Sequence, residues 1–291
     1  MNKYNLGGHS GCQIFLVENE DGTVYVRKIS KNIEYNERLE KQCKKQKLYR
    51  NGLVKSPKVL NQGFNEEGLF YFDMEYIQGV TLAEYIKTVE IGKVKGLVKT
   101  LVKSLVPNVD IIVSREQKEV IQDIFINKLN SLRQSIQFDN AVIDEAIIML
   151  ENHDWSKIVP SSCHGDMTLE NIIIKNDCLY LIDFLDSFYD SWFIDVATLM
   201  QDVQVMWSYR FMDEISMNIV LRLIVFRDLL LDEIKQINSS YIIEIYYSLL
   251  QKLIRIYPYV RDKSTYKFLN EKVKIIITNI KQMEVQEEVG V

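Results

Sequence analysis

The stretch SSCHGDMTLENIIIKNDCLYLIDFLD, residues 161–186, decides how this chain is expected to fold. Two short apolar runs, 172–174 and 179–182, lie on either side of the polar turn pair 176–177. Short apolar runs separated by such a pair are typical of two antiparallel strands joined by a tight turn. The sequence therefore predicts a β-hairpin with polar residues at both of its ends.

Three of these polar residues can do chemistry together. Asp166 and Asn171 precede the hairpin and Asp183 follows it, so we expect the turn to bring them close in space. Two carboxylates and a carboxamide offer the hard oxygen ligands that suit Mg²⁺ beside phosphate groups. A carboxylate that stays free of metal can accept the proton of a hydroxyl group. Phosphoryl transfer needs both of these functions.

The same residues carry a family resemblance. His164-Gly165-Asp166-x-x-x-x-Asn171, followed by Leu181-Ile182-Asp183-Phe184, resembles the catalytic core of the aminoglycoside phosphotransferase and choline kinase superfamily. The resemblance implies an α+β, bilobal protein-kinase-like fold. A small β-rich N-terminal lobe would cover residues 1–77 and bind nucleotide, and a larger, mostly helical C-terminal lobe would cover 78–291 and bind the acceptor.

The resemblance also implies roles for the motif residues. Asp166 would orient and deprotonate the acceptor hydroxyl, and His164 would brace the catalytic loop. Asn171 and Asp183 would hold Mg²⁺ against the phosphates of ATP. Asp195 would anchor the loop from the following helix.

A glycine-rich turn and a basic strand precede the motif. Gly8 and Gly11 belong to a turn that we expect to cover the phosphates of the nucleotide, because glycines let backbone N–H groups approach phosphate. The fold then needs a cation on the strand expected over residues 24–29, where Arg27 and Lys28 compete. Strand alternation places Lys28 on the same face as Val26, which should face the adenine, so we prefer Lys28. An exposed basic pair remains the alternative.

Two further elements of the expected nucleotide site follow. The predicted helix over residues 33–50 should carry an acid that pairs with Lys28. Glu37 and Glu40 are both candidates and we prefer Glu40, whereas Gln42 would be an unusual replacement for the acid. The strand expected over 68–77 resembles the family's lobe connector, where the backbone of Glu75 to Ile77 would bond the adenine edge.

The rest of the chain is predicted to be mostly helical, with helices over 117–136, 141–150, 203–231, 241–257 and 265–283. Carboxylates and aromatic rings suit a cationic acceptor, so Asp186, Asp190 and Trp192 are candidates for the acceptor pocket. Burial of the aromatic rings in the core is the alternative. His153 is expected to be a packing or surface residue.

Composition narrows the classes further. The net charge of −5 gives no basic footprint for nucleic acid. The four cysteines show no paired zinc spacing and suggest reduced thiols in the cytoplasm. The sequence has neither an apolar signal core nor an uninterrupted apolar run of membrane-spanning length.

The sequence therefore predicts an ATP- and Mg²⁺-dependent phosphotransferase acting on a hydroxyl of a small molecule: a sugar, an amino sugar or an amino alcohol such as choline. The alternative is a nucleotide-binding pseudokinase with a regulatory or scaffold role. Neither the identity of the acceptor nor the oligomeric state follows from the sequence.

Overall fold

The chain folds into two compact units, each assembled from separate stretches of sequence. The first unit comprises Met1–Tyr85, His164–Asp166 and Glu170–Ser187, and the second comprises Ile86–Cys163, Met167–Leu169 and Phe188–Val291. The computed structural model describes residues 2–7, 11–107, 112–138, 140–212 and 214–289. The predicted boundary between the two lobes at residue 77 stays a prediction. The predicted hairpin around residues 172–182 belongs to the first unit.

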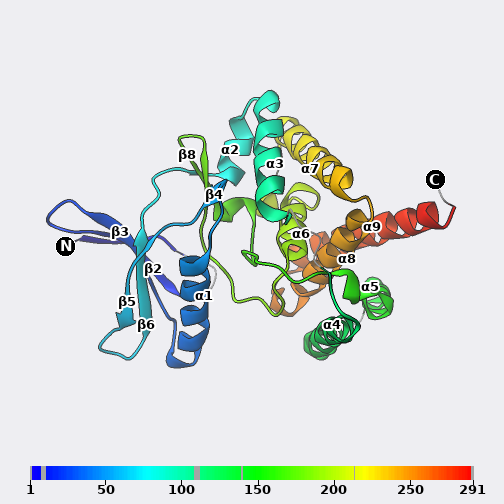
Figure 1. Ribbon diagram of the computed structural model, residues 1–291, viewed down its shortest axis with the longest axis horizontal. Coiled ribbons are helices and arrows are strands. Elements are labelled where there is room, and N and C mark those ends of the chain that lie inside the picture. Colours follow the sequence, from blue (N-terminus) through cyan, green and yellow to red (C-terminus); the bar gives the residue numbers. More distant parts are fainter. Residues whose placement is uncertain (1, 8–10, 108–111, 139, 213, 290–291) are drawn as a thin grey trace. The chain divides into compact units, whose positions relative to one another are not determined.

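A five-stranded antiparallel sheet forms the larger part of the first unit. Its spatial order is β1 (Asn2–Asn5), β2 (Gln13–Glu18), β3 (Val24–Ile29), β6 (Phe70–Glu75) and β5 (Val59–Phe64). Helix α1 (Asn36–Leu48), which follows the short 3-10 turn η1 (Ile33–Tyr35), packs beside this sheet (Figure 1). Leu39 and Cys43 of the helix join Val26, Phe72 and Met74 of the sheet in one apolar core.

A second, four-stranded sheet of the first unit contains the predicted hairpin. Its order is β4 (Val54–Lys55), β9 (Cys178–Leu181), β8 (Ile172–Lys175) and β7 (Val80–Thr81). The turn between β8 and β9 places Asn176 at φ 50° and Asp177 at φ 59°. Two successive left-handed residues make the tight turn that matches the twist of a hairpin, and Asn and Asp tolerate this conformation well. The predicted hairpin is confirmed.

Helices make up most of the second unit. They are α3 (Ile91–Leu105), α4 (Arg115–Ser135), α5 (Ala141–Asn152), α6 (Trp192–Val203), α7 (Met217–Ile237), α8 (Tyr241–Ile254) and α9 (Lys263–Val289), and the short α2 (Leu82–Thr88) links the two units in sequence. Every residue of α6 and most of α8 are buried, because these two helices pack against each other and are covered by neighbours (Figure 1). Within the described residues, no helix is both long and apolar enough to cross a membrane.

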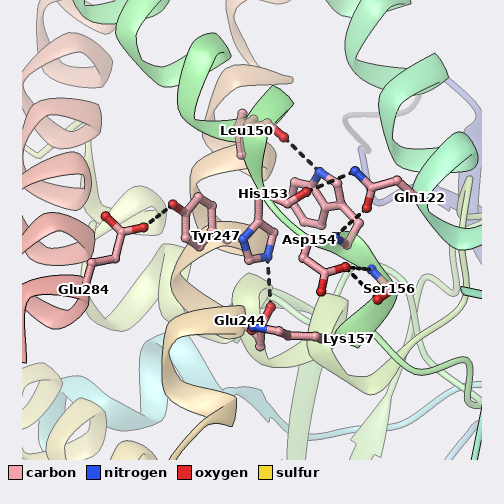
Figure 2. Close-up of polar contacts among 10 residues, drawn as sticks. Gln122, Leu150, His153, Asp154, Ser156, Lys157, Glu244, Tyr247 and Glu284 are labelled. Atoms are coloured by element: carbon pink, nitrogen blue, oxygen red, sulfur yellow. Dashed lines mark hydrogen bonds and ion pairs between the residues drawn. The ribbon is translucent and has the colours of Figure 1, made fainter. Parts of the chain in front are cut away.

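A buried polar cluster ties four helical elements of the second unit together (Figure 2). The His153 ring lies stacked on Tyr247 with their centroids 3.7 Å apart, and its Nε2 lies 2.8 Å from the Glu244 carboxylate. The Tyr247 hydroxyl donates to Glu284 at 2.5 Å, and Lys157 lies 3.4 Å from Glu244. His153 is thus a packing residue, buried beside the α8 carboxylate.

The predicted helix over residues 203–231 is wrong at its start. Helix α6 ends at Val203, Met206 adopts a left-handed conformation at φ 64°, and α7 begins only at Met217. The Asp202 carboxylate explains the break: one oxygen accepts from the Ser208 N–H at 3.0 Å and hydroxyl at 2.7 Å, which fixes a turn. Its other oxygen accepts the Leu169 N–H at 2.7 Å.

Candidate active site

The segment His164-Gly165-Asp166 of the first unit is fixed by a buried imidazole. The His164 Nε2 lies 2.7 Å from the Ile182 carbonyl, and its Nδ1 accepts the Asp166 N–H at 3.3 Å. Burial lowers the pKa of His164 to about 4, so the ring is neutral at neutral pH. The neutral tautomer that satisfies both contacts carries its proton on Nε2 and donates it to the carbonyl. This geometry orients the backbone that carries Asp166.

Gly165 is required by a close approach between two segments. Its φ is 93°, and a Cβ there would lie 2.3 Å from Ser187 Oγ and 2.9 Å from the Leu185 carbonyl oxygen. The Leu185 N–H donates to the His164 carbonyl at 3.0 Å beside it. Only glycine fits this position, because any side chain would push the segment after Asp183 away from the loop.

Asn171 connects Asp166 to the end of the hairpin. Its Nδ2 donates to the Asp166 backbone carbonyl at 2.9 Å and to the Asp166 carboxylate at 3.3 Å, and its own carbonyl accepts the Ile182 N–H at 3.0 Å. Because the amide nitrogen is directed at Asp166, the Oδ1 atom faces the other way and can serve as a ligand.

Asp183 and Lys28 form the charged centre of the site. The Lys28 side chain is buried, and its Nζ contacts the Asp183 carboxylate and lies 3.3 Å from Gln42 Oε1. Asp183 adopts φ 65°, a left-handed conformation that costs free energy for a residue with a side chain. Strain of this kind concentrates at functional sites, where the surrounding structure holds it in place.

Arg27 lies on the opposite face of β3 from Lys28. Its guanidinium makes two hydrogen bonds to Asp73, at 2.6 and 2.8 Å, and lies over the Tyr71 ring. Hydrogen bonding to Asp73 raises the pKa of Arg27. Arg27 and Lys28 therefore point to opposite faces of β3, as strand alternation predicts. Lys28 is the one of the two that contacts Asp183.

The helix residue beside Lys28 is Gln42, and the expected pairing with Glu40 is absent. Glu40 lies on the exposed face of α1, whereas Leu39, Gln42, Cys43 and Gln46 share the buried face. Glu37 pairs with Lys41 at the surface, at 2.9 Å. Helical spacing from Leu39 places position 42, rather than position 40, on the buried face. The preference for Glu40 is therefore wrong, and the unusual replacement of the acid by Gln42 is what the structure contains.

The other predicted nucleotide residues are only partly described. Gly8 lies outside the described residues, whereas Gly11 has φ 77°. Glu75 ends β6 and donates its backbone N–H to the Lys58 carbonyl at 2.9 Å, and Ile77 is buried two residues later. Their expected contacts with adenine stay predictions.

The three candidate acceptor residues differ in accessibility. Trp192 is 1% exposed and stacks on Phe193 at 4.0 Å, so it is a core residue and a ligand has no access to it. Asp190 is exposed and accepts a hydrogen bond from the Cys163 thiol at 3.2 Å. Asp186 is half-buried in the first unit.

The donor set suits Mg²⁺. The Asp183 carboxylate and the Asn171 Oδ1 are hard oxygen ligands on adjoining parts of one hairpin. Among the residues that the structure describes, no three His, Cys, Asp or Glu side chains form a metal-binding cluster. A metal ion held here therefore needs phosphate oxygens and water to complete its coordination, as Mg²⁺ commonly does beside a nucleotide.

Comparison with known proteins defines the class. Residues 5–223 match the model of the phosphotransferase enzyme family, APH. The chain therefore belongs to this family, which confirms the resemblance and the predicted enzyme class. A search of curated proteins gives no significant match.

Solved structures share the fold at low sequence identity. The aminoglycoside phosphotransferase APH(4)-Ia is 15% identical, with a TM-score of 0.65 over 95% of this chain and 93% of that chain. A putative fructosamine-3-kinase from Haemophilus somnus 129PT is 14% identical, with a TM-score of 0.55 over 95% of this chain and 91% of that one. These similarities confirm the predicted α+β, protein-kinase-like fold class.

Proposed function

We propose that this phosphotransferase moves the γ-phosphate of ATP to a hydroxyl of a small molecule. One observation carries the proposal: in the first unit Lys28 contacts Asp183, and Asn171 contacts Asp166. The backbone hydrogen bond from the Ile182 N–H to the Asn171 carbonyl, at 3.0 Å, joins the two pairs. This is the order of groups that phosphoryl transfer uses, from phosphate-binding cation through metal ligands to the residue that faces the nucleophile.

Structural relatives support the choice of a nucleotide. Thermostable mutants of APH(4)-Ia have been solved in ternary complexes with ADP or AMP-PNP and hygromycin B. A mutant of aminoglycoside 2'-phosphotransferase-IIIa has been solved as a GDP complex. We propose ATP as the donor and a sugar, amino sugar or amino alcohol such as choline as the acceptor class. Half-buried Asp186 of the first unit and exposed Asp190 of the second unit are each, taken separately, a proposed carboxylate for a cationic acceptor.

In the proposed mechanism, Asp166 aligns the acceptor hydroxyl and takes its proton as the bond to phosphorus forms. Its carboxylate is held ready by Asn171 and by the backbone that His164 fixes. Lys28 binds the α- and β-phosphates. Mg²⁺, held by Asp183 and Asn171, would supply charge neutralisation for the phosphate oxygens. The Gly7–Gly11 turn is proposed to cover the phosphates.

A pseudokinase remains the second candidate because one observation favours it. The helix position beside Lys28 holds a neutral Gln42 in place of the expected acid. A protein that only binds nucleotide could dispense with that acid. Against this reading, the groups that would act on the acceptor are all present.

The four cysteines are all free thiols, which supports our proposal of a reducing, cytoplasmic location.

Turnover separates the two candidates. The protein is incubated with Mg²⁺-ATP and a panel of amino alcohols, aminoglycosides and sugars, and ADP release is measured. Asp166→Ala should lower turnover by about 10³-fold or more while ATP binding is retained, because a base and positioning group is removed. Asp177→Asn is the matched control, since it removes a carboxylate from the turn of the same hairpin. Full activity of Asp166→Ala would contradict the mechanism, and ATP binding without any turnover would favour the pseudokinase.

A further inference from the structure

A pocket of about 690 Å³ opens in the first unit at the end of α1. The last turn of α1, the strands β4 and β9, the start of β5 and the end of β6 line it. Lys28, Asp166, Asn171 and Asp183 are not among its lining residues. It is therefore separate from the proposed catalytic groups.

The charge of the pocket is opposite to that of the chain. Four basic side chains and one carboxylate line the pocket, so its formal charge is +3. These residues are Lys47, Arg50, Lys55, Lys58 and Glu75. The whole chain carries −5. A concentration of positive charge within an acidic protein creates a local potential that attracts anions.

None of the four cations is neutralised by a carboxylate within the part of the chain that the structure describes. Lys47 Nζ contacts the neutral Gln62 side chain at 3.2 Å, and Arg50 Nη1 bonds two carbonyls at the helix end at 2.8 Å. Lys55 lies 5.7 Å from the centre of the Tyr180 ring, which also lines the pocket. Glu75 is the one lining carboxylate and offsets one of the four charges in the net total, so a bound anion or salt would relieve the repulsion among the remaining three.

The pocket also offers directional donors. Arg50 has Nε and Nη2 without a partner among the described residues, and the Lys58 ammonium likewise contacts no described group. Guanidinium and ammonium groups together match the oxygens of phosphate, and the Tyr180 face provides a surface for the non-phosphate part of a ligand.

We propose that this basic pocket is a binding site for a small, multivalent, phosphate-bearing anion, distinct from the proposed phosphate- and metal-binding residues Lys28, Asn171 and Asp183; the proposed adenine contact Glu75 also lines it. The inference rests on the pocket and its charges alone and does not depend on the proposed phosphotransfer.

Inorganic pyrophosphate is the probe, titrated calorimetrically into the full-length protein without divalent cations and at fixed ionic strength. Lys55→Gln combined with Lys58→Gln should weaken binding about tenfold or more, since two charge-assisted contacts are lost. Lys3→Gln combined with Lys44→Gln is the matched control. It removes two exposed lysines of the same unit that do not line the pocket, and should change the affinity by less than about twofold. Equal thermal midpoints check the folding of both double variants.

A variant of Lys28, the proposed catalytic cation, distinguishes binding in the pocket from binding at the catalytic site. Lys28→Met should retain pyrophosphate binding, because Lys28 does not line the pocket. Binding that is lost in Lys28→Met but kept in the Lys55/Lys58 variant would place the anion at the catalytic cation and overturn the proposal. No binding to the wild type, or equal loss in the control variant, would also overturn it. Tighter binding of citrate than of pyrophosphate would overturn the assignment to phosphate.

Discussion

Lys28 is held between a charged and a neutral partner, Asp183 and Gln42. The carboxylate is also a proposed metal ligand, so a bound metal ion would compete with the lysine for its oxygens. Gln42 then becomes the group that keeps Lys28 in place, because its Oε1 lies 3.3 Å from the ammonium and its Nε2 is anchored 3.3 Å from the Tyr35 hydroxyl. Gln42 is therefore a positioning residue that acts through Lys28.

Replacement of Gln42 tests this role. Gln42→Leu removes a hydrogen bond worth about 1 kcal/mol, so the KM for ATP should rise about fivefold with a smaller change in kcat. Gln42→Glu restores an oxygen acceptor of the same length and should return the KM close to the wild-type value. Steady-state kinetics at saturating acceptor gives both constants. An unchanged KM in Gln42→Leu would show that Lys28 is positioned without this helix.

His164 makes stability depend on pH in a defined direction. Its pKa in the folded protein is about 4, below the value of about 6.5 expected when the chain is unfolded. Between these values the unfolded chain binds more protons, so the contribution of His164 to stability is lost as the pH falls from about 6.5 towards 4.

The size of this effect can be measured by urea unfolding. The wild-type free energy of unfolding should fall by about 2 kcal/mol more between pH 7 and pH 5 than that of His164→Gln, which cannot take up the proton. The difference between the two pH profiles, rather than either profile alone, isolates the imidazole. Parallel profiles would show that His164 is accessible to protons in the folded state.

At the scale of elements, the β8–β9 turn fixes the distance between the two halves of the site. Asn176 and Asp177 both have positive φ, a conformation that a β-branched side chain adopts only at a cost of about 1–2 kcal/mol. Asp177→Val should therefore lower the free energy of unfolding by about that amount, while Asp177→Gly should be neutral or slightly stabilising. Chemical denaturation measures both. Equal stability of the two variants would mean that the turn relaxes to another type.

The sequence predicted some elements well because a single local signal decided them. The Asn176-Asp177 pair and its flanking apolar runs fixed the hairpin. At the start of α2 the signal is equally local: the Thr81 hydroxyl accepts the Glu84 N–H at 3.2 Å, as threonine commonly does before a helix. The break between α6 and α7 was missed because its cause is tertiary. The Asp202 carboxylate captures Ser208 only after both segments have been positioned.

At the scale of the whole molecule, nucleotide binding should be visible as stabilisation. A ligand that binds only the folded state at about a hundred times its Kd adds about 2.7 kcal/mol, which raises the Tm by about 5 °C for a chain of this size. ADP with Mg²⁺ should produce this shift, and ADP with a chelator should produce less. Asp183→Asn should remove the difference between the two conditions, as followed by differential scanning calorimetry. A full shift without Mg²⁺ would argue against a metal held by Asp183.

The family and the fold could be predicted from residues 161–186, whereas the acceptor could not. The spacing of Asp166, Asn171 and Asp183 is typical of phosphoryl transfer. The motif alone therefore predicts the class of reaction. Trp192 shows why an acceptor pocket is harder to predict: aromatic rings at helical spacing serve a core as well as a ligand site, and this one is buried. Only three-dimensional packing separates the two uses.

Asp202 constrains how this enzyme can evolve. One buried carboxylate serves Leu169, within the segment between Asp166 and Asn171, and also both donors of Ser208. A mutation that removed the carboxylate would leave donors without an acceptor in two distant stretches of sequence at once. A second change at position 208 could not compensate, because the Leu169 and Ser208 backbone N–H groups would still lack their acceptor.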